Sequence, residues 1–252
     1  MKKRIKRIIL FSVFAIIISA LIWFFQFYSF GYMITVPFRQ GYTKIAENVY
    51  VHKDYSVQNE EILSMISTAK VRVNDFFGEI RSNPTLIFCD DKKERTFVNS
   101  GATSTYLKLT YCSIGLKEHC NVDVIAHELT HAETHERIIS FWDCFNFNQI
   151  LKIPIWFNEG LATQNDYREK YSEERWQTET NGGKTATALS DMDTPKKFYS
   201  GDAGEDGCSS RFHYMCAKHE VAGWIKKHGK SVLFKLLDGV KKGESFEKLY
   251  FK

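Results

Sequence analysis

The segment VDVIAHELTHAETHER, residues 122–137, carries the strongest functional signal in this chain. His127 and His131 stand four residues apart, and Glu128 directly follows the first histidine. Side chains four residues apart on a helix lie on the same face, so the two imidazoles can converge on one zinc ion. Glu128 would then reach a zinc-bound water without being a ligand itself, as a His-Glu-x-x-His pattern requires.

The alternative is an ordinary helix that carries histidines by chance, so a zinc site needs a third ligand. His135 is not predicted to be that ligand, because two helical turns, roughly 12 Å along the axis, separate it from His127. Residues 152–167, KIPIWFNEGLATQNDY, contain a better candidate in Glu159. A carboxylate among apolar residues is costly to bury without a partner, and a zinc ion would remove that cost. The neighbouring Gly160 is small enough to let this predicted helix pack closely against another element.

The pattern HELTH (127–131) followed by WFNEGLA (156–162) resembles the gluzincin zinc metallopeptidases. In those families a glutamate on a second helix, in an Asn-Glu or Glu-Gly-x-Ala context, is the third zinc ligand. The resemblance covers roughly residues 45–252, and its C-terminal part includes a tyrosine that opens a helix, here Tyr214. It implies a zincin-like metallopeptidase fold with Zn²⁺ as the cofactor. It also implies three metal ligands and one catalytic base, which are His127, His131 and Glu159 for the metal and Glu128 for the base.

The metal chemistry predicts a mechanism for this site. Three protein ligands leave the fourth zinc position for water, whose pKa zinc lowers toward about 7. Glu128 would take a proton from that water and later pass it to the leaving amine. A hydrogen-bond donor should face the developing oxyanion. Tyr214 is the first candidate for this donor and His213 the second, and simple packing at a helix start is an equally good interpretation of both.

The predicted function is that of a zinc-dependent endopeptidase, which hydrolyses peptide or protein substrates. Two alternatives stay open. The first is a non-catalytic gluzincin-like scaffold or assembly factor, which a degenerate site would favour, whereas Glu128 is intact. The second is a zinc hydrolase that acts on non-peptide envelope substrates, because a fold does not determine the substrate.

Hydrophobic periodicity predicts one α+β domain over residues 41–252. A strand, a helix and two further strands are expected first, at 47–55, 59–78, 84–90 and 104–115. Helix patterns dominate from residue 119 onward, so a small mixed sheet and the active-site helix should precede a mostly helical C-terminal half. Residues 104–115 alternate between polar and apolar side chains, which is typical of a strand with one solvated face. Such a strand can hold an extended peptide by β-augmentation.

Residues 1–40 differ from the rest of the chain. Five of residues 2–7 are basic, and from Ile8 to Phe25 the only polar residues are serines. A helix needs about 20 apolar residues to cross a bilayer, whereas a cleaved signal peptide has an apolar region of about 7 to 15. We interpret this segment as an uncleaved transmembrane signal anchor, with a cleaved signal peptide as the alternative. The basic cluster would stay cytoplasmic, so the catalytic domain of this single-pass membrane protein would be exported.

The charge distribution argues against nucleic acid as a partner. The whole chain has a net charge of +4, and residues 1–40 hold six basic and no acidic residues. The remaining residues, 41–252, therefore carry a net charge of about −2. No basic patch of the kind that binds phosphate backbones is present in the sequence.

The cysteine content predicts disulfides. There are six cysteines, all beyond residue 40, and an exported domain would lie in an oxidising compartment. We expect at least two disulfides, although six cysteines allow 15 pairings and the sequence does not choose among them. Buried free thiols are the alternative for one or two of the six.

Overall fold

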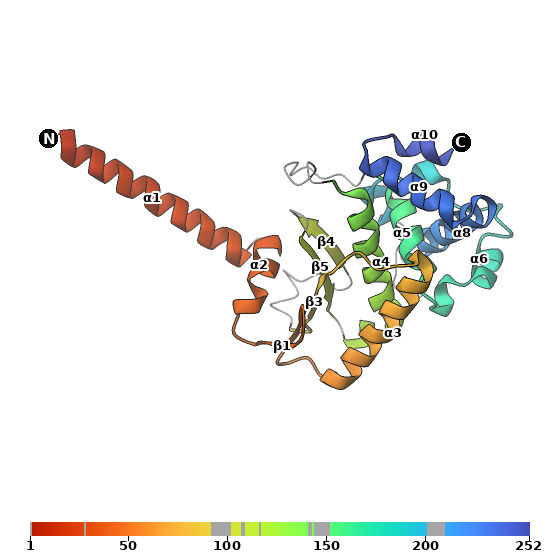
Figure 1. The fold of residues 1–252 in the computed structure, drawn as a ribbon, viewed down its shortest axis with the longest axis horizontal. Helices are drawn as coiled ribbons and strands as arrows, with labels where there is room; N and C mark the ends of the chain where they lie inside the picture. Colours follow the sequence, from red (N-terminus) through yellow and green to blue (C-terminus); the bar gives the residue numbers. More distant parts are fainter. Residues whose placement is uncertain are drawn as a thin grey trace.

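The computed structural model describes residues 2–27, 29–91, 102–106, 109–115, 117–140, 143, 152–200 and 210–252. Its strands are β1 (Tyr42–Ala46), β2 (Val49–His52), β3 (Thr85–Phe88), β4 (Ala102–Tyr106) and β5 (Leu109–Ile114). Its α-helices are α1 (Lys2–Phe27), α2 (Ser29–Thr35), α3 (Asn59–Phe77), α4 (Val122–Ile138), α5 (Ile155–Gln164), α6 (Glu173–Glu179), α7 (Pro195–Phe198), α8 (Arg211–His228), α9 (Lys230–Lys241) and α10 (Phe246–Tyr250). Short 3₁₀ helices lie at Val36–Phe38, Lys117–His119, Glu169–Tyr171 and Leu189–Asp191. Figure 1 shows the helical C-terminal half beside the sheet.

The five strands form one mixed sheet in the order β1-β2-β3-β5-β4. Strands β2, β3 and β5 are parallel, while β1 and β4 pair antiparallel at the two edges. The predicted α+β arrangement, a small mixed sheet followed by a mostly helical half, is confirmed. The predicted single strand over 104–115 is wrong, because β4 and β5 form an antiparallel pair with Tyr106 opposite Leu109. Only residues 107 and 108 separate the two strands, so periodicity alone does not reveal where one strand ends and the next begins.

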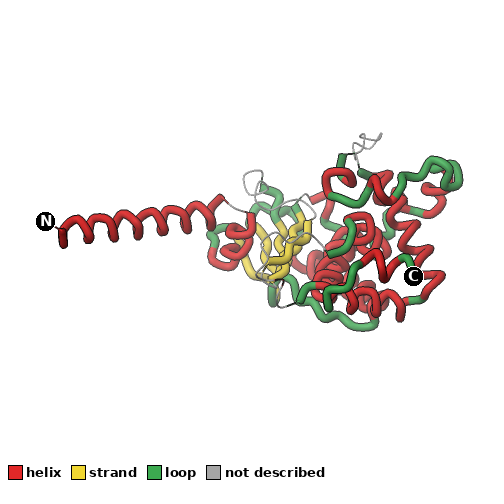
Figure 2. Tube along the Cα trace, turned by 90° about the horizontal axis from the view of Figure 1, so that it is seen from above, coloured by secondary structure: helices red, strands yellow, loops and turns green. Residues whose placement is uncertain are grey.

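Different parts of the chain cover the two faces of the sheet. On one face, Leu86 and Phe88 join the main core together with apolar residues of α3 and α4. On the other face, Ile87 and Tyr111 belong to a second buried cluster with Tyr32, Met33 and Val36. This alternation along β3 is the two-residue period of a strand. Figure 2 shows the strands between the N-terminal helices and the helical half.

Local sequence signals explain where the helices begin, end and touch. Helix α3 ends at Gly78, whose φ of 79° lies in the left-handed region that favours glycine. Helix α4 begins after Asn121, whose side chain accepts a hydrogen bond from the backbone N–H of Val124 at 2.9 Å. Helix α5 packs on α8 so closely that a Cβ at Gly160 would lie 2.5 Å from the carbonyl oxygen of Ala217. The predicted close packing at Gly160 is therefore confirmed.

The predicted transmembrane signal anchor is wrong. Among the helices in the described part of the chain, none is long and apolar enough to span a membrane. The predicted single-pass topology, with a cytoplasmic N-terminus and an exported catalytic domain, depended on this anchor and is no longer supported. Helix α1 begins with two mostly basic turns. Helix α1 extends away from the sheet (Figure 1), and its Phe11 side chain is 74% exposed.

The prediction of at least two disulfides is also wrong. The four cysteines that the structure describes are all free, and these are Cys89, Cys112, Cys120 and Cys216. Cys144 and Cys208 lie outside the described residues, so at most one disulfide remains possible. The described thiols lie next to other groups and not next to each other. The sulfur of Cys112, for example, lies 3.2 Å from the hydroxyl of Thr103. Burial raises the pKa of the Cys112 thiol, which keeps it protonated.

Candidate metal centre

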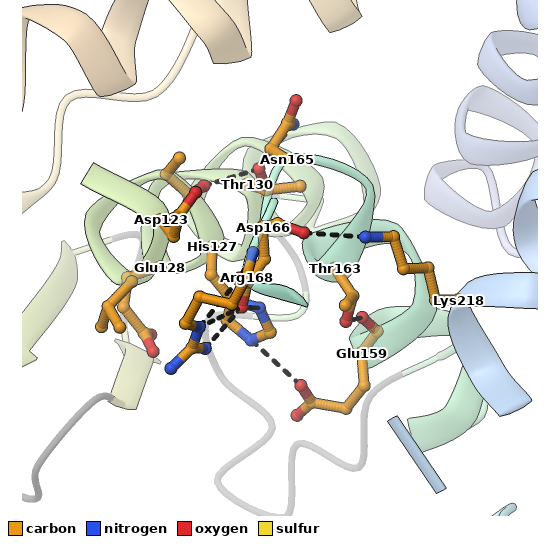
Figure 3. Close-up of polar contacts among 12 residues, drawn as sticks. Asp123, His127, Glu128, Thr130, Glu159, Thr163, Asn165, Asp166, Arg168 and Lys218 are labelled. Atoms are coloured by element: carbon orange, nitrogen blue, oxygen red, sulfur yellow. Dashed lines mark hydrogen bonds and ion pairs between the residues drawn. The ribbon is translucent and has the colours of Figure 1, made fainter. Parts of the chain in front are cut away.

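Helices α4 and α5 bring the three predicted metal ligands together. His127 and His131 project from one face of α4, and Glu159 projects from α5. The Nε2 atoms of the two histidines are 3.1 Å apart, and each lies 3.2 Å from Oε2 of Glu159. Figure 3 shows the His127 imidazole facing the Glu159 carboxylate. Three potential ligand atoms thus form a nearly equilateral triangle.

The triangle has the dimensions of a metal site. With metal–ligand distances of about 2.0 to 2.1 Å, neighbouring ligand atoms of a tetrahedral zinc site are about 3.3 Å apart. The observed separations are 3.1 and 3.2 Å. All three residues are buried, with exposures of 4% to 6%. The cluster can therefore hold a metal ion, although several divalent metals accept imidazole and carboxylate ligands.

The charges in the cluster balance each other. Burial lowers the pKa of His131, but the Glu159 carboxylate outweighs burial and raises the pKa to about 9. Burial raises the pKa of Glu159, but the two histidines, His131 foremost, bring it well below its ordinary value. Glu159 is therefore ionised at neutral pH, as a metal ligand must be. His131 carries a proton that a metal ion would have to displace.

Glu128 lies next to the metal ligands but is held by the sheet. Its side chain is buried, and Oε2 accepts a hydrogen bond from the hydroxyl of Thr103 on β4 at 2.7 Å. Burial raises the pKa of Glu128 above its ordinary value, and the imidazoles of His127 and His131 and the Thr103 hydrogen bond offset this only in part. The Glu128 carboxylate is thus not one of the three converging ligand groups, and the edge strand orients it.

Outer polar contacts hold the loop after α5 against α4 (Figure 3). The Asp166 side chain is fully buried and accepts hydrogen bonds from the backbone N–H of Arg168 at 3.1 Å and from its Nε at 2.9 Å. Oδ2 of Asp166 lies 3.7 Å from Nδ1 of His127. Lys218 on α8 donates to the backbone carbonyl of Asp166 at 2.8 Å. The separation between Asp166 and His127 is too long for a hydrogen bond, so Asp166 acts on His127 as a nearby negative charge.

Two tyrosines complete the surroundings of Glu159. The hydroxyl of Tyr199 donates a hydrogen bond to Oε1 of Glu159 at 2.5 Å. The ring of Tyr214, on α8, lies against His127 with 5.9 Å between ring centroids. The two tyrosines are close enough for each to affect the pKa of the other. Tyr214, predicted as the oxyanion donor, is therefore beside the metal ligands, whereas Tyr199 contacts one of them directly.

Two other histidines considered in the sequence lie outside the ligand triangle. Nδ1 of His213 is 2.7 Å from the carbonyl oxygen of Phe198, so this ring is engaged with backbone. Nδ1 of His135 is 2.9 Å from the hydroxyl of Thr105 on β4. Burial lowers the pKa of His135 to about 3, so its ring is neutral. Neither residue is placed to ligate the same ion as His127.

Two residues that contact the site, Thr103 and Tyr199, have no signal in the sequence that identifies them. Thr103 lies 25 residues before Glu128, and Tyr199 lies 40 residues after Glu159. Neither belongs to a motif, and each reaches the site only through tertiary packing. Asp166 follows Glu159 closely in the chain, so a search for acidic residues near the ligands is the one sequence criterion that would include it.

No family model matches this chain, and comparisons with curated proteins and with solved structures give no match. The case for a function therefore depends on the residues described above.

Proposed function

We propose that this protein is a zinc-dependent endopeptidase in which His127, His131 and Glu159 hold the metal and Glu128 is the general base. One observation carries the proposal: three ligand atoms converge within 3.2 Å of one another while a fourth group, Glu128, is held apart by Thr103. A purely structural metal site needs no such additional carboxylate. Catalytic zinc sites, by contrast, combine three protein ligands with an open position and a nearby base.

The donor set supports zinc as the metal. Two imidazole nitrogens and one carboxylate oxygen form the ligand set of several hydrolytic zinc enzymes, whereas magnesium and calcium sites are built from oxygen ligands. When bound, zinc lowers the pKa of a coordinated water toward about 7 and polarises the substrate carbonyl.

The chain's own residues supply the proton transfers. Glu128 accepts a proton as water attacks the scissile carbonyl, and the same carboxyl group delivers that proton to the leaving amine nitrogen. The Tyr214 hydroxyl supplies a donor for the oxyanion that develops at the carbonyl. Burial raises the pKa of Tyr214 well above its ordinary value, so this hydroxyl keeps its proton throughout the working pH range.

The edge strand supports a peptide as the substrate. In the described sheet β4 is a terminal strand that pairs with β5 on one side. Two of its side chains, Thr103 and Thr105, reach α4 at Glu128 and His135. An extended peptide that adds to the other side of β4 by main-chain hydrogen bonds would therefore run alongside the helix that carries the base.

A peptide library provides the test. The zinc-loaded full chain and its Glu128→Gln variant, matched for zinc content, are incubated with the library and the products are sequenced. We expect internal cleavage by the wild-type protein and turnover at least about 10²-fold lower in the variant. Equal cleavage by both proteins would remove Glu128 from the mechanism. Absence of cleavage by a fully zinc-loaded wild-type protein would favour a non-catalytic scaffold or a non-peptide substrate instead.

A further inference from the structure

The two oxygens of Glu159 have different partners. Oε2 faces both metal-binding imidazoles at 3.2 Å, and Oε1 accepts the hydrogen bond from the Tyr199 hydroxyl at 2.5 Å. A carboxylate can bind a metal through one oxygen or through both. A strong donor on one oxygen leaves the other as the single metal-binding atom. The described structure therefore already holds Glu159 in the orientation of a one-oxygen ligand.

We propose that Tyr199 is a positioning residue of the metal site, whose hydroxyl keeps Glu159 as a one-oxygen ligand aimed at His127 and His131. The consequence for the metal is an open coordination position, because a two-oxygen carboxylate would occupy it. This inference depends on the metal-binding part of the proposed function and is independent of whether any peptide is hydrolysed.

The chain anchors Tyr199 from two directions. Towards α5, the first-turn N–H groups of Ile155 and Trp156 donate to the carbonyl oxygens of Asp193 and Met192, each at 3.2 Å, just before α7. These bonds satisfy helix N-terminal donors that lack partners within the helix. They also tie the segment that leads into Tyr199 to the helix that carries Glu159.

Towards α8, the anchor is Phe198, the residue before Tyr199. Phe198 is fully buried, and its ring contacts Tyr214 with 5.0 Å between centroids. Its carbonyl oxygen is 2.7 Å from Nδ1 of His213. The backbone at the end of α7 is thus held by α8 through His213.

The chemistry of the tyrosine suits this role. A tyrosine hydroxyl carries a proton at neutral pH, and this one donates to the Glu159 carboxylate. A hydrogen bond to an ionised acceptor is shorter and stronger than a neutral one. Removing an outer partner of this kind from a metal site typically weakens metal binding by about 10- to 100-fold.

The test compares two tyrosine-to-phenylalanine variants of the full chain. Tyr199→Phe removes the hydroxyl beside Glu159. Tyr250→Phe is the matched control, because the Tyr250 hydroxyl also donates to a glutamate, Glu220, at 2.8 Å, but from α10 to α8 and not at the metal ligands. The zinc dissociation constant is measured on metal-free protein by competition with a chelator, and the visible spectrum of the Co²⁺ form reports its coordination. Melting temperatures of the metal-free proteins are recorded in parallel.

We expect Tyr199→Phe to raise the zinc dissociation constant about 10- to 100-fold and to change the Co²⁺ spectrum. Tyr250→Phe should leave both within about threefold of the wild type, while the two variants show similar melting temperatures when metal-free. Equal zinc affinities in Tyr199→Phe and wild type would overturn the proposal, as would a wild-type chain that binds no zinc. A zinc-bound crystal structure provides a check that needs no variant. Two coordinating oxygens from Glu159, or a Tyr199 hydroxyl turned away from it, would contradict the inference.

Loss of hydrolysis and loss of metal binding are distinguishable in these experiments. If the peptide library shows no cleavage but Tyr199→Phe still loses zinc affinity, the positioning role stands and the peptidase proposal does not. If cleavage occurs and zinc affinity is unchanged in Tyr199→Phe, the opposite holds.

Discussion

Thr103 donates a hydrogen bond from its hydroxyl to Oε2 of Glu128, with 2.7 Å between the oxygens. The same hydroxyl lies 3.0 Å from the backbone carbonyl oxygen of Glu128 and 3.2 Å from the sulfur of Cys112. A threonine hydroxyl has only one proton, and the charged carboxylate is both the nearest and the strongest acceptor of the three. The edge strand of the sheet thus orients the proposed general base, so a peptide that added to this strand would bind to the element that positions Glu128.

The first prediction concerns this hydrogen bond. Thr103→Val keeps the size of the side chain but removes its proton, so Glu128 loses the partner that orients it. We expect kcat to fall roughly tenfold with little change in KM and no change in zinc content. Thr103→Ser retains the hydroxyl and should return kcat to within about threefold of the wild type. If Thr103→Ser were as impaired as Thr103→Val, packing of the threonine methyl group, and not its hydrogen bond, would be the cause.

The second prediction separates metal binding from proton transfer. Glu159→Ala removes one of three ligands, so zinc affinity should fall by several orders of magnitude, together with the stability that bound metal adds. Glu128→Gln keeps all three ligands, so zinc should stay near one ion per chain while turnover falls at least about 10²-fold. Atomic spectroscopy of dialysed protein and thermal melts measure both effects. Tightly bound stoichiometric zinc in Glu159→Ala would exclude that residue from the site.

The third prediction concerns the pH dependence of zinc affinity. In the metal-free protein the pKa of His131 is about 9, so below that pH a metal ion must displace its proton. Zinc affinity should therefore rise between pH 6 and pH 8, by up to about tenfold per pH unit. Calorimetric titration in buffers of different ionisation enthalpy would detect release of about one proton near pH 7. A zinc affinity independent of pH would show that His131 is already neutral in the metal-free site.

The stability of the metal-free protein should follow the opposite trend. A histidine whose pKa is raised by folding contributes stability that is complete below its unfolded value, near 6.5, and is lost as the pH rises through about 9. The melting temperature of the metal-free chain should consequently fall across this window, while that of the zinc-loaded chain does not. A metal-free melting temperature that rises with pH would contradict the charged His131–Glu159 pair.

The fourth prediction uses two glycines on facing helices. A Cβ at Gly160 would lie 2.5 Å from the carbonyl oxygen of Ala217 and 2.6 Å from a methyl carbon of Val221. Gly160→Ala should therefore destabilise the protein by about 1 to 3 kcal/mol and weaken zinc binding, because it displaces the helix that carries Glu159. Gly223 lies in α8 with open space around it, so Gly223→Ala should be neutral or stabilise by up to about 1 kcal/mol. Chemical denaturation of both variants gives the comparison.

The fifth prediction is a thiol count. Because the four described cysteines are free, at least four thiols should react with a thiol reagent under denaturing conditions without reductant. The count would be six if Cys144 and Cys208 are also reduced. A count of two or fewer would require at least one of Cys89, Cys112, Cys120 and Cys216 to form a disulfide, whereas all four are free in this fold.

Local features of this protein were predictable from the sequence because they depend on neighbours along the chain. The four-residue spacing of His127 and His131 places both imidazoles on one helical face in any fold that keeps the helix. Asn121 caps that helix through a bond to a residue three positions away. The small size of Gly160 likewise predicts close packing, although not the identity of the partner helix.

Tertiary structure alone decided the contacts between distant segments. Thr103 reaches Glu128 because the edge strand β4 lies beside α4, and Tyr199 reaches Glu159 because backbone hydrogen bonds join α5 to the residues just before α7. Such contacts depend on how whole elements pack, which residue periodicity does not encode. For the same reason, the sequence predicts one strand where the fold has the antiparallel pair β4 and β5. It likewise predicts disulfides where the described cysteines are free. Pairing, for strands and for thiols alike, is determined by which segments the folded core brings within bonding distance.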